Sequence, residues 1–256
     1  MRRLGLVLIA PALVVYVAIC CALYFGQRSL MYFPTPESTS ARAEALSITT
    51  DGAVIKVWRV PGARDRALIY FGGNGDDVAA QIQPFAAMFP GVTIYLVNYR
   101  GYGGSTGTPS EAALLADAET VFDRVHAEHE RVAVLGRSLG SGIAVHLAAV
   151  REVSKLALVT PYDSILKIAQ RRLPFVPVSW LLKDIFDSVA KAPRVRAPVL
   201  ALLAELDSSI PREHSERLVA AFAPGQVTVL TIAGTDHNTI SESPEYGRAL
   251  GAFLRD

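Results

Sequence analysis

Cysteine is nearly absent from this chain of 256 residues. The two cysteines, Cys20 and Cys21, are adjacent and lie in an apolar N-terminal segment. The rest of the sequence therefore cannot form a disulfide, use a thiolate nucleophile or hold zinc through cysteines. With so few cysteines, the sequence does not indicate whether the protein works in an oxidising or a reducing cellular compartment.

The chain also lacks an excess of charge of either sign. It has 25 lysines and arginines against 24 aspartates and glutamates, for a net charge of +1, and these charges are evenly spread. A nucleic-acid-binding protein needs a basic patch or stripe, so we expect no nucleic-acid partner. No internal repeat or low-complexity tract is visible, and the length suits one large domain.

Between Arg3 and Arg28 there is no charged side chain. At about 1.5 Å per residue, the apolar residues 4–25 span roughly the 30 Å of bilayer hydrocarbon. We predict that residues 1–26 form an uncleaved transmembrane anchor. A cleaved signal peptide is the alternative, but its apolar run is usually shorter and no convincing cleavage site precedes Gln27.

The charges beside the anchor predict its orientation. Arg2 and Arg3 favour a cytoplasmic N-terminus, which puts the domain after the anchor of a single-pass protein outside, in the periplasm if the source is bacterial. Arg28 on the far side weakens this bias. Residues 34–40 are polar and marked by prolines, and we expect residues 27–45 to form a linker between the anchor and the domain.

Residues 46–256 alternate strand-like and helix-like patterns. The first two strand-like runs form a hairpin across Asp51 and Gly52, and the later runs are nearly continuously apolar, as in strands buried on both faces. This predicts an α/β fold with a mostly parallel eight-stranded sheet and helices on both faces. The predicted strands are residues 46–50, 54–60, 67–71, 92–98, 131–135, 156–160, 198–204 and 227–233, and the predicted helices are residues 76–88, 110–128, 139–150, 211–222 and 242–254.

The interval 161–197 breaks this alternation. It is too long for a loop and contains no good strand, so we predict a small helical cap above the carboxyl edge of the sheet, where ligands bind in such folds. Its large apolar side chains, among them Phe175, Trp180 and Phe186, either face acyl chains or membrane, or pack the cap on the core.

The sequence Gly136-Arg137-Ser138-Leu139-Gly140 joins a β-branched run to an apolar helical pattern. A serine at the apex of such a turn, flanked by glycines, is typical of a nucleophile elbow, whose helix N-terminus stabilises developing negative charge. We expect Ser138 to be the nucleophile. The alternative is a small-residue turn that packs a helix on a sheet.

A serine nucleophile needs a base, and the chain has five histidines. His237 follows the last predicted strand, in a loop that can place its imidazole beside the elbow, so we expect it to be the base. His126 and His129 have a spacing that could bind metal, but a solvated helix end is the simpler interpretation, and we expect no metal site. His146 lies on a helix directed away from the elbow, and His214 is expected to be exposed.

The base needs an acid that holds its tautomer. Asp207 follows the predicted strand 198–204, and the order Ser138, Asp207, His237 matches the order in α/β-hydrolase triads. Glu205 is a competitor two residues away, and Asp236 would have to fold back on His237.

The tetrahedral intermediate needs hydrogen-bond donors, and losing one typically costs about 10² to 10³ in rate. We expect the N–H groups of Leu139 and of Asn74, in a glycine-rich loop, to form this oxyanion hole. Gly73 and Tyr102 are expected to line the substrate pocket. The loop has neither the spacing of a dinucleotide site nor a Walker lysine, so no nucleotide cofactor is expected.

Several motifs together carry a family resemblance. They are YFGGNG, NYRGYGGSTGTPSE, GRSLGSGIAVHLA, AELDSSIP, the terminal DHN, and RSLMYFPTP after the anchor. With them the chain resembles the α/β-hydrolase superfamily from about residue 46 to the C-terminus, and within it the small-cap, membrane-anchored serine hydrolases of the Bem and ABHD type. Glu205 departs from the family pattern, which commonly has glycine two residues before the acid.

The resemblance implies a serine hydrolase that cleaves carboxylic ester or thioester bonds through an acyl-enzyme. An acyl or lipid-like substrate would suit the apolar cap and the anchor. A serine peptidase on the same triad is one alternative. The other is a membrane-tethered binding protein without catalysis, because a fold does not determine a function.

Overall fold

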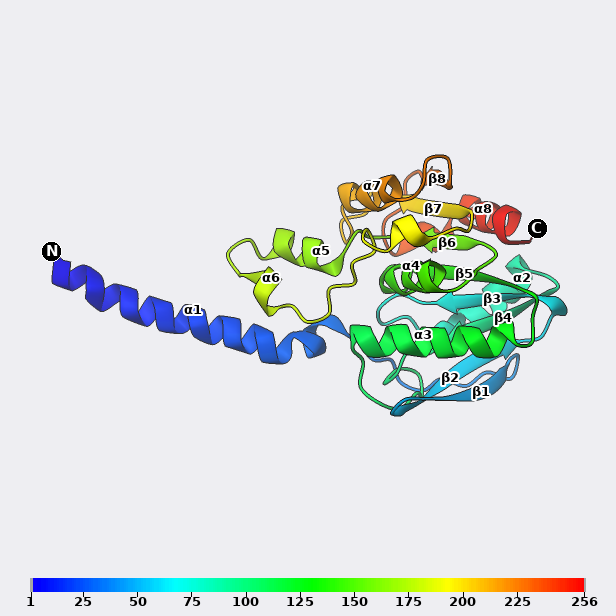
Figure 1. Ribbon diagram of the computed structural model, residues 1–256, viewed down its shortest axis with the longest axis horizontal. Coiled ribbons are helices and arrows are strands. Elements are labelled where there is room, and N and C mark those ends of the chain that lie inside the picture. The colour runs from blue at the N-terminus through cyan, green and yellow to red at the C-terminus, as the bar shows by residue number, and fades with distance from the viewer. Residues whose placement is uncertain (1, 256) are drawn as a thin grey trace.

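The structure is a computed structural model that describes residues 2–255, with side chains from residue 11 onward. Its centre is one eight-stranded sheet in the order β1-β2-β4-β3-β5-β6-β7-β8 (Figure 1). β2 pairs antiparallel with β1 and β4, and all other neighbours are parallel. The strands are β1 (Glu44–Thr50), β2 (Ala53–Val60), β3 (Ala63–Phe71), β4 (Val92–Val97), β5 (Arg131–Arg137), β6 (Leu156–Val159), β7 (Val199–Ala204) and β8 (Val227–Ile232).

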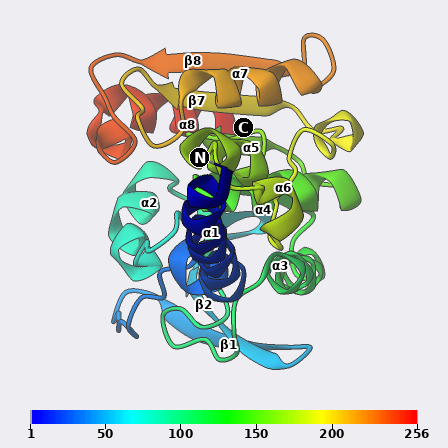
Figure 2. The same cartoon turned by 90° about the vertical axis from the view of Figure 1, so that its left-hand side faces the viewer.

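Helices cover both faces of this sheet (Figure 2). One face packs against α3 (Glu111–His126) and α4 (Leu139–Val150), and the other packs against α2 (Ile82–Met88) and α8 (Pro244–Arg255). The central strands are apolar throughout because both of their faces are covered; β4 and β7 are buried at every position. The predicted α/β fold class is confirmed.

The predicted elements lie close to the observed ones. All eight strands are present, and each differs from its predicted range by a few residues at most. The helix predicted over residues 76–88 begins as a 3-10 turn, η1 (Val78–Gln81), whose N-cap Asp77 accepts from the Ala79 N–H. Ser110 caps α3 in the same way, by accepting from the Ala113 N–H. The helix predicted over residues 211–222 is α7 (Arg212–Ala221).

The interval between β6 and β7 holds three short helices: α5 (Ile165–Arg172), α6 (Val178–Leu181) and η2 (Ala192–Arg194). α5 and α6 stand away from the sheet, beside the long N-terminal helix (Figure 1). We call residues 161–197 the cap.

The N-terminal helix α1 (Arg2–Met31) projects from the domain. Its segment Pro11–Met31 is long and apolar enough to cross a membrane, by length and composition alone, and it is not buried inside the protein. α1 continues past residue 26, so the expected linker of residues 27–45 is helical at its start. Contacts between the end of α1 and the cap account for this: the Gln27 side chain donates to the Leu181 carbonyl, and Arg28 pairs with Asp184.

Candidate active site

Ser138 occupies a sharp turn between β5 and α4. Its backbone has φ 50° and ψ −117°, a conformation that side-chain-bearing residues rarely adopt and that concentrates at functional sites. The flanking glycines make this turn possible. A Cβ on Gly136 would lie 2.4 Å from the Gly140 carbonyl oxygen, and one on Gly140 would lie 2.1 Å from the Phe71 carbonyl oxygen. The strand, turn and helix predicted around Ser138 are therefore present.

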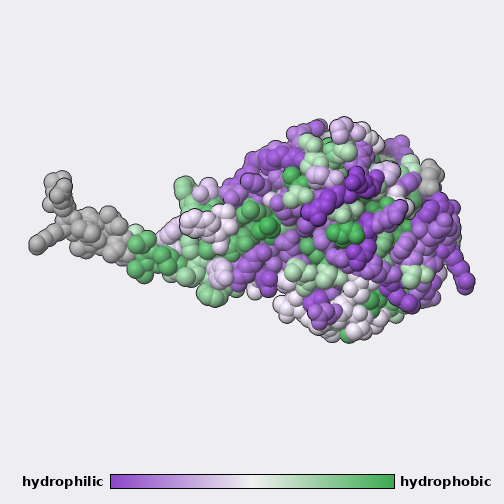
Figure 3. Space-filling model, in the orientation of Figure 1, coloured by the Kyte–Doolittle hydropathy of each residue, from purple (hydrophilic) through white to green (hydrophobic). Residues whose placement is uncertain are grey.

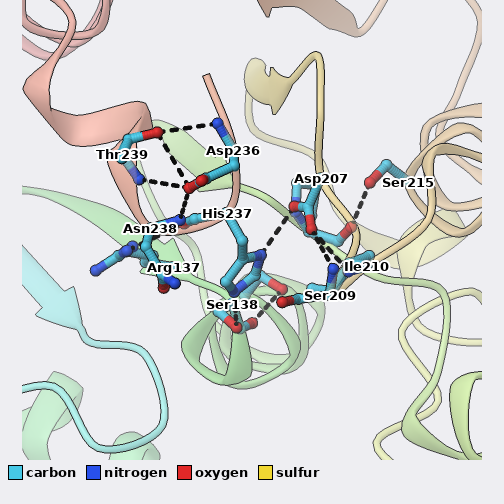
Figure 4. Close-up of polar contacts among 12 residues, drawn as sticks. Arg137, Ser138, Asp207, Ser209, Ile210, Ser215, Asp236, His237, Asn238 and Thr239 are labelled. Atoms are coloured by element: carbon cyan, nitrogen blue, oxygen red, sulfur yellow. Dashed lines mark hydrogen bonds and ion pairs between the residues drawn. The ribbon is translucent and has the colours of Figure 1, made fainter. Parts of the chain in front are cut away.

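Two hydrogen bonds connect Ser138, His237 and Asp207 (Figure 4). His237 Nε2 lies 2.9 Å from Ser138 Oγ, and His237 Nδ1 lies 2.8 Å from Asp207 Oδ2. An ionised carboxylate can only accept, so Nδ1 carries the proton and Nε2 accepts from the serine hydroxyl. The three residues follow β5, β7 and β8, which are parallel and end at the same edge of the sheet.

The structure distinguishes the three carboxylates considered for the acid. Asp207 Oδ1 accepts from the N–H groups of Ser209 and Ile210, at 2.9 and 2.8 Å, which leaves Oδ2 for the histidine. Glu205 turns away and accepts from the Gly234 N–H at 2.8 Å.

Asp236 serves its own loop. Its carboxylate accepts from the N–H groups of Thr239 and Asn238, which lower the pKa of the Asp236 carboxyl below its ordinary value. It does not fold back on the imidazole of His237.

The loop after β3 lies against the nucleophile. A Cβ on Gly73 would be 3.7 Å from Ser138 Cβ, so Gly73 faces the serine directly. Within residues 2–255, the N–H groups of Asn74 and Leu139 have no hydrogen-bond acceptor. Free N–H groups on either side of a serine are what an oxyanion hole requires.

Known proteins share this architecture. Residues 67–192 match the sequence model of a protein family described as "alpha/beta hydrolase fold". An uncharacterized protein of Mycobacterium tuberculosis, Rv2307c, is 34% identical over 227 residues, which are 83% of this chain and 80% of that protein. Protein bem46 of Schizosaccharomyces pombe is 26% identical over 251 residues, 91% of this chain and 83% of that protein.

The chain belongs to the α/β-hydrolase superfamily. The likeness to bem46 confirms the resemblance to the Bem and ABHD type. The solved structure of the esterase Pf2001 from Pyrococcus furiosus has a TM-score of 0.70, covering 87% of this chain and 98% of that chain. Its identity is 18%, so it shows the shared fold alone. Membership in this superfamily supports a hydrolase.

Arg137 links the loops of this α/β-hydrolase, a role that its local sequence did not predict. It precedes the nucleophile, and its guanidinium donates to the His237 carbonyl at 3.1 Å. On the other side it lies 4.0 Å from Asp76, which accepts from the Tyr70 hydroxyl at 2.7 Å. The available signal was its position between Gly136 and Ser138, since a charged residue inside such a tight turn must find a partner.

Tyr102 has a different position from the one expected. Its ring is 2% exposed, and burial raises the pKa of its hydroxyl to about 12. The hydroxyl donates to Asn74 Oδ1 and accepts from the Phe33 N–H, both at 2.8 Å. The expectation that Tyr102 lines the substrate pocket is therefore corrected: Tyr102 packs in the core and supports the Asn74 loop.

Two other histidine assignments also need correction. His214 was expected to be exposed, but it is 2% exposed and its Nδ1 lies 2.8 Å from Asp163 Oδ1. His129 was expected at a solvated helix end, but its Nε2 lies 2.9 Å from the Tyr95 hydroxyl, and burial lowers the pKa of its imidazole. Both are buried by segments distant in sequence, which a local pattern does not reveal.

The remaining histidines lie outside the site. His146 Nε2 is 2.8 Å from Glu119 Oε1, and His126 is exposed and stacks on Phe122. In the part of the chain that the structure describes, no three His, Cys, Asp or Glu side chains gather as a metal site would require.

A groove of about 370 Å³ opens between α1 and the cap. Its lining is apolar apart from Gln27, Asn74 and Arg172. Asn74 therefore contributes both to this groove and to the loop that faces Ser138. The other lining residues are Leu23, Leu30, Met31, Phe33, Ile165, Ile168, Ala169, Leu173, Val176, Val178, Leu181 and Leu182.

Proposed function

We propose that this protein hydrolyses carboxylic ester or thioester bonds of acyl substrates through an acyl-enzyme on Ser138. The observation that supports this most strongly is the pair of hydrogen bonds from Asp207 to His237 and from His237 to Ser138. A serine hydroxyl becomes a useful nucleophile when a base removes its proton, and the base works when an acid holds its tautomer.

In the acylation step, Ser138 Oγ attacks the substrate carbonyl carbon while His237 Nε2 takes the hydroxyl proton. Asp207 stabilises the resulting imidazolium. The N–H groups of Asn74 and Leu139 donate to the oxyanion. The intermediate then collapses, the bond to the alcohol or thiol breaks, and His237 gives its proton to that leaving group.

In the deacylation step, a water molecule attacks the acyl carbon of the ester on Ser138. His237 takes a proton from this water, the oxyanion forms again at the same donors, and the acyl–Oγ bond breaks. The proton returns to Ser138 Oγ, and the carboxylic acid leaves. Each residue thus ends in its starting protonation state.

The apolar groove beside Asn74 favours an acyl substrate over a peptide, because it offers little charge for binding a peptide. We also propose that residues 1–26 anchor the protein in a membrane, with the N-terminus cytoplasmic and the domain of residues 46–256 outside. The hydropathy of Pro11–Met31 and the arginines before it support this topology.

The test is labelling of the full-length protein in detergent by a fluorophosphonate probe, with Ser138→Ala and His237→Ala beside it. We expect labelling of the wild type alone. Turnover of p-nitrophenyl esters should fall by about 10⁶ in Ser138→Ala, by analogy with other triad nucleophiles. A folded wild type that is not labelled would contradict this function and favour a binding protein.

A further inference from the structure

The groove between α1 and the cap has one wall from each element. Leu23, Leu30 and Met31 of α1 form one side, and residues of α5 and α6 such as Ile168 and Leu181 form the other. Figure 3 shows hydrophobic surface that continues from α1 onto the adjoining cap. The segment with the length and composition of a membrane span is thus also a wall of this groove.

The outer end of the cap is itself suited to a membrane. Residues 173–182 contain no charged residue, and they lie between Arg172 and Lys183. Phe175 is 87% exposed and Trp180 is 86% exposed. Large apolar side chains this exposed mark an interaction surface, and an aromatic residue near flanking cations is typical of a membrane interface.

The cap lies alongside the apolar part of α1. The Tyr16 hydroxyl donates to the Phe175 carbonyl at 2.9 Å, and Lys183 Nζ lies 4.0 Å from the ring centroid of Tyr24. Tyr16 and Tyr24 are about two helical turns apart, roughly 12 Å along the axis. One leaflet contributes about 15 Å of hydrocarbon, so a cap docked here reaches into a single leaflet while Lys183 stays near its surface.

Polar contacts hold the two walls together. The Gln27 side chain donates to the Leu181 carbonyl at 3.0 Å and accepts from the Lys183 N–H at 2.7 Å. Arg28 forms a two-point pair with Asp184, at 2.9 and 3.1 Å, and Asp184 also accepts from the Tyr32 hydroxyl. These contacts make the groove a preformed feature of the fold.

The inner end of the groove reaches the loop after β3, which faces Ser138. Phe33 and Asn74 line it there, and Asn74 is adjacent to Gly73, which faces Ser138. A chain lying in the groove would therefore have its carbonyl end directed toward the nucleophile and its far end toward the apolar surfaces of α1 and the cap.

We propose that this groove is the acyl-chain site, that it opens sideways into one leaflet, and that it takes long-chain acyl esters or thioesters directly from the bilayer. The inference rests on the proposed hydrolase function and deepens it. The N-terminal helix is then a wall of the substrate site as well as a tether.

The test compares substrates of different chain length on variants that fill the groove. Leu30→Trp fills it from α1 and Ala169→Trp fills it from α5. Val14→Trp is the matched control, because Val14 is an exposed residue of the same helix that does not line the groove. Ala252→Trp, at an exposed position of α8, is the control for the second variant.

We expect kcat/KM for p-nitrophenyl palmitate in lipid-detergent micelles to fall roughly tenfold or more in Leu30→Trp and Ala169→Trp, because several methylene groups lose their burial. The value for p-nitrophenyl acetate should stay within about twofold, since catalysis is unchanged and only chain burial is lost. Both controls should behave like the wild type.

Fluorophosphonate labelling separates the possible failures. If both groove variants are labelled like the wild type and keep its preference for palmitate, the groove is not the acyl site, although the hydrolase function stands. If the folded wild type is neither labelled nor active, both proposals are wrong. Two variants on opposite walls keep the test decisive if one of them does not fold.

Discussion

The Asn74 side chain donates a hydrogen bond of 2.6 Å to the Met31 carbonyl, and so joins the loop that faces the nucleophile to the last residue of α1. Its Oδ1 also accepts from the Phe33 N–H at 3.0 Å and from the Tyr102 hydroxyl at 2.8 Å. One amide side chain therefore couples the N-terminal helix to the candidate oxyanion hole.

Replacing this amide should lower both activity and stability. Asn74→Ala removes three hydrogen bonds and leaves the buried Tyr102 hydroxyl without its acceptor, which typically costs about 1–3 kcal/mol. We expect kcat for short p-nitrophenyl esters to fall roughly tenfold, because misplaced oxyanion donors slow the chemical step. The apparent Tm should fall by several degrees.

Tyr102→Phe provides a graded comparison for Asn74→Ala. It removes one of the three contacts and leaves those to Met31 and Phe33 in place. Its loss of activity should be clearly smaller. Equal losses in the two variants would indicate that the core packing of Tyr102, and not the amide, positions the loop.

Asp207→Asn tests which carboxylate holds His237. An amide at this position favours the wrong imidazole tautomer, and in a well-studied triad this change lowers kcat by about 10⁴. Glu205→Gln should change kcat little, because Glu205 contacts the Gly234 N–H and not the imidazole. Steady-state kinetics on the two variants measure this directly. A larger loss in Glu205→Gln would assign the acid role to Glu205.

His129 should make the protein less stable at mildly acidic pH. Burial lowers the pKa of its imidazole below the ordinary value near 6.5, so the folded protein keeps it neutral while the unfolded chain takes up a proton. Stability is therefore retained above about pH 6.5 and lost as the pH falls below it.

The measurement is the apparent Tm at about pH 7.5 and about pH 5.5. His129→Gln should show a smaller decrease between these values than the wild type, although His146, whose pKa burial also lowers, keeps part of the effect. His126→Gln is the control because His126 is exposed. An unchanged decrease in His129→Gln would show that this histidine is not the sensitive group.

Trp180 should be quenched by brominated lipids when the protein is placed in vesicles. The chain has two tryptophans, and Trp58 is 4% exposed in the core while Trp180 is 86% exposed at the end of the cap. We expect strong quenching of the Trp180 emission and little of the Trp58 emission. Trp180→Phe should remove the quenched component, and a Trp180 emission that brominated lipids leave unquenched in the wild type would place the cap outside the bilayer.

The strands, the main helices and the elbow could be predicted from the amino-acid sequence alone. These features depend on local properties: apolar runs predict strands buried on both faces, and only glycines fit beside Ser138 in so tight a turn. The order of Ser138, Asp207 and His237 along the chain, each after a parallel strand, also predicted that the three would meet at one edge of the sheet.

Other features depend on how distant parts of the chain pack together. Asp207 and Glu205 are two residues apart, and only the path of their loop decides which one reaches the imidazole. The burial of His214 depends on contact with Asp163, which is distant in sequence. The groove likewise exists because α1 meets the cap, as where Gln27 contacts Leu181 across more than half of the chain. Local patterns specify local conformation, whereas such contacts arise only when the packed core brings distant segments together.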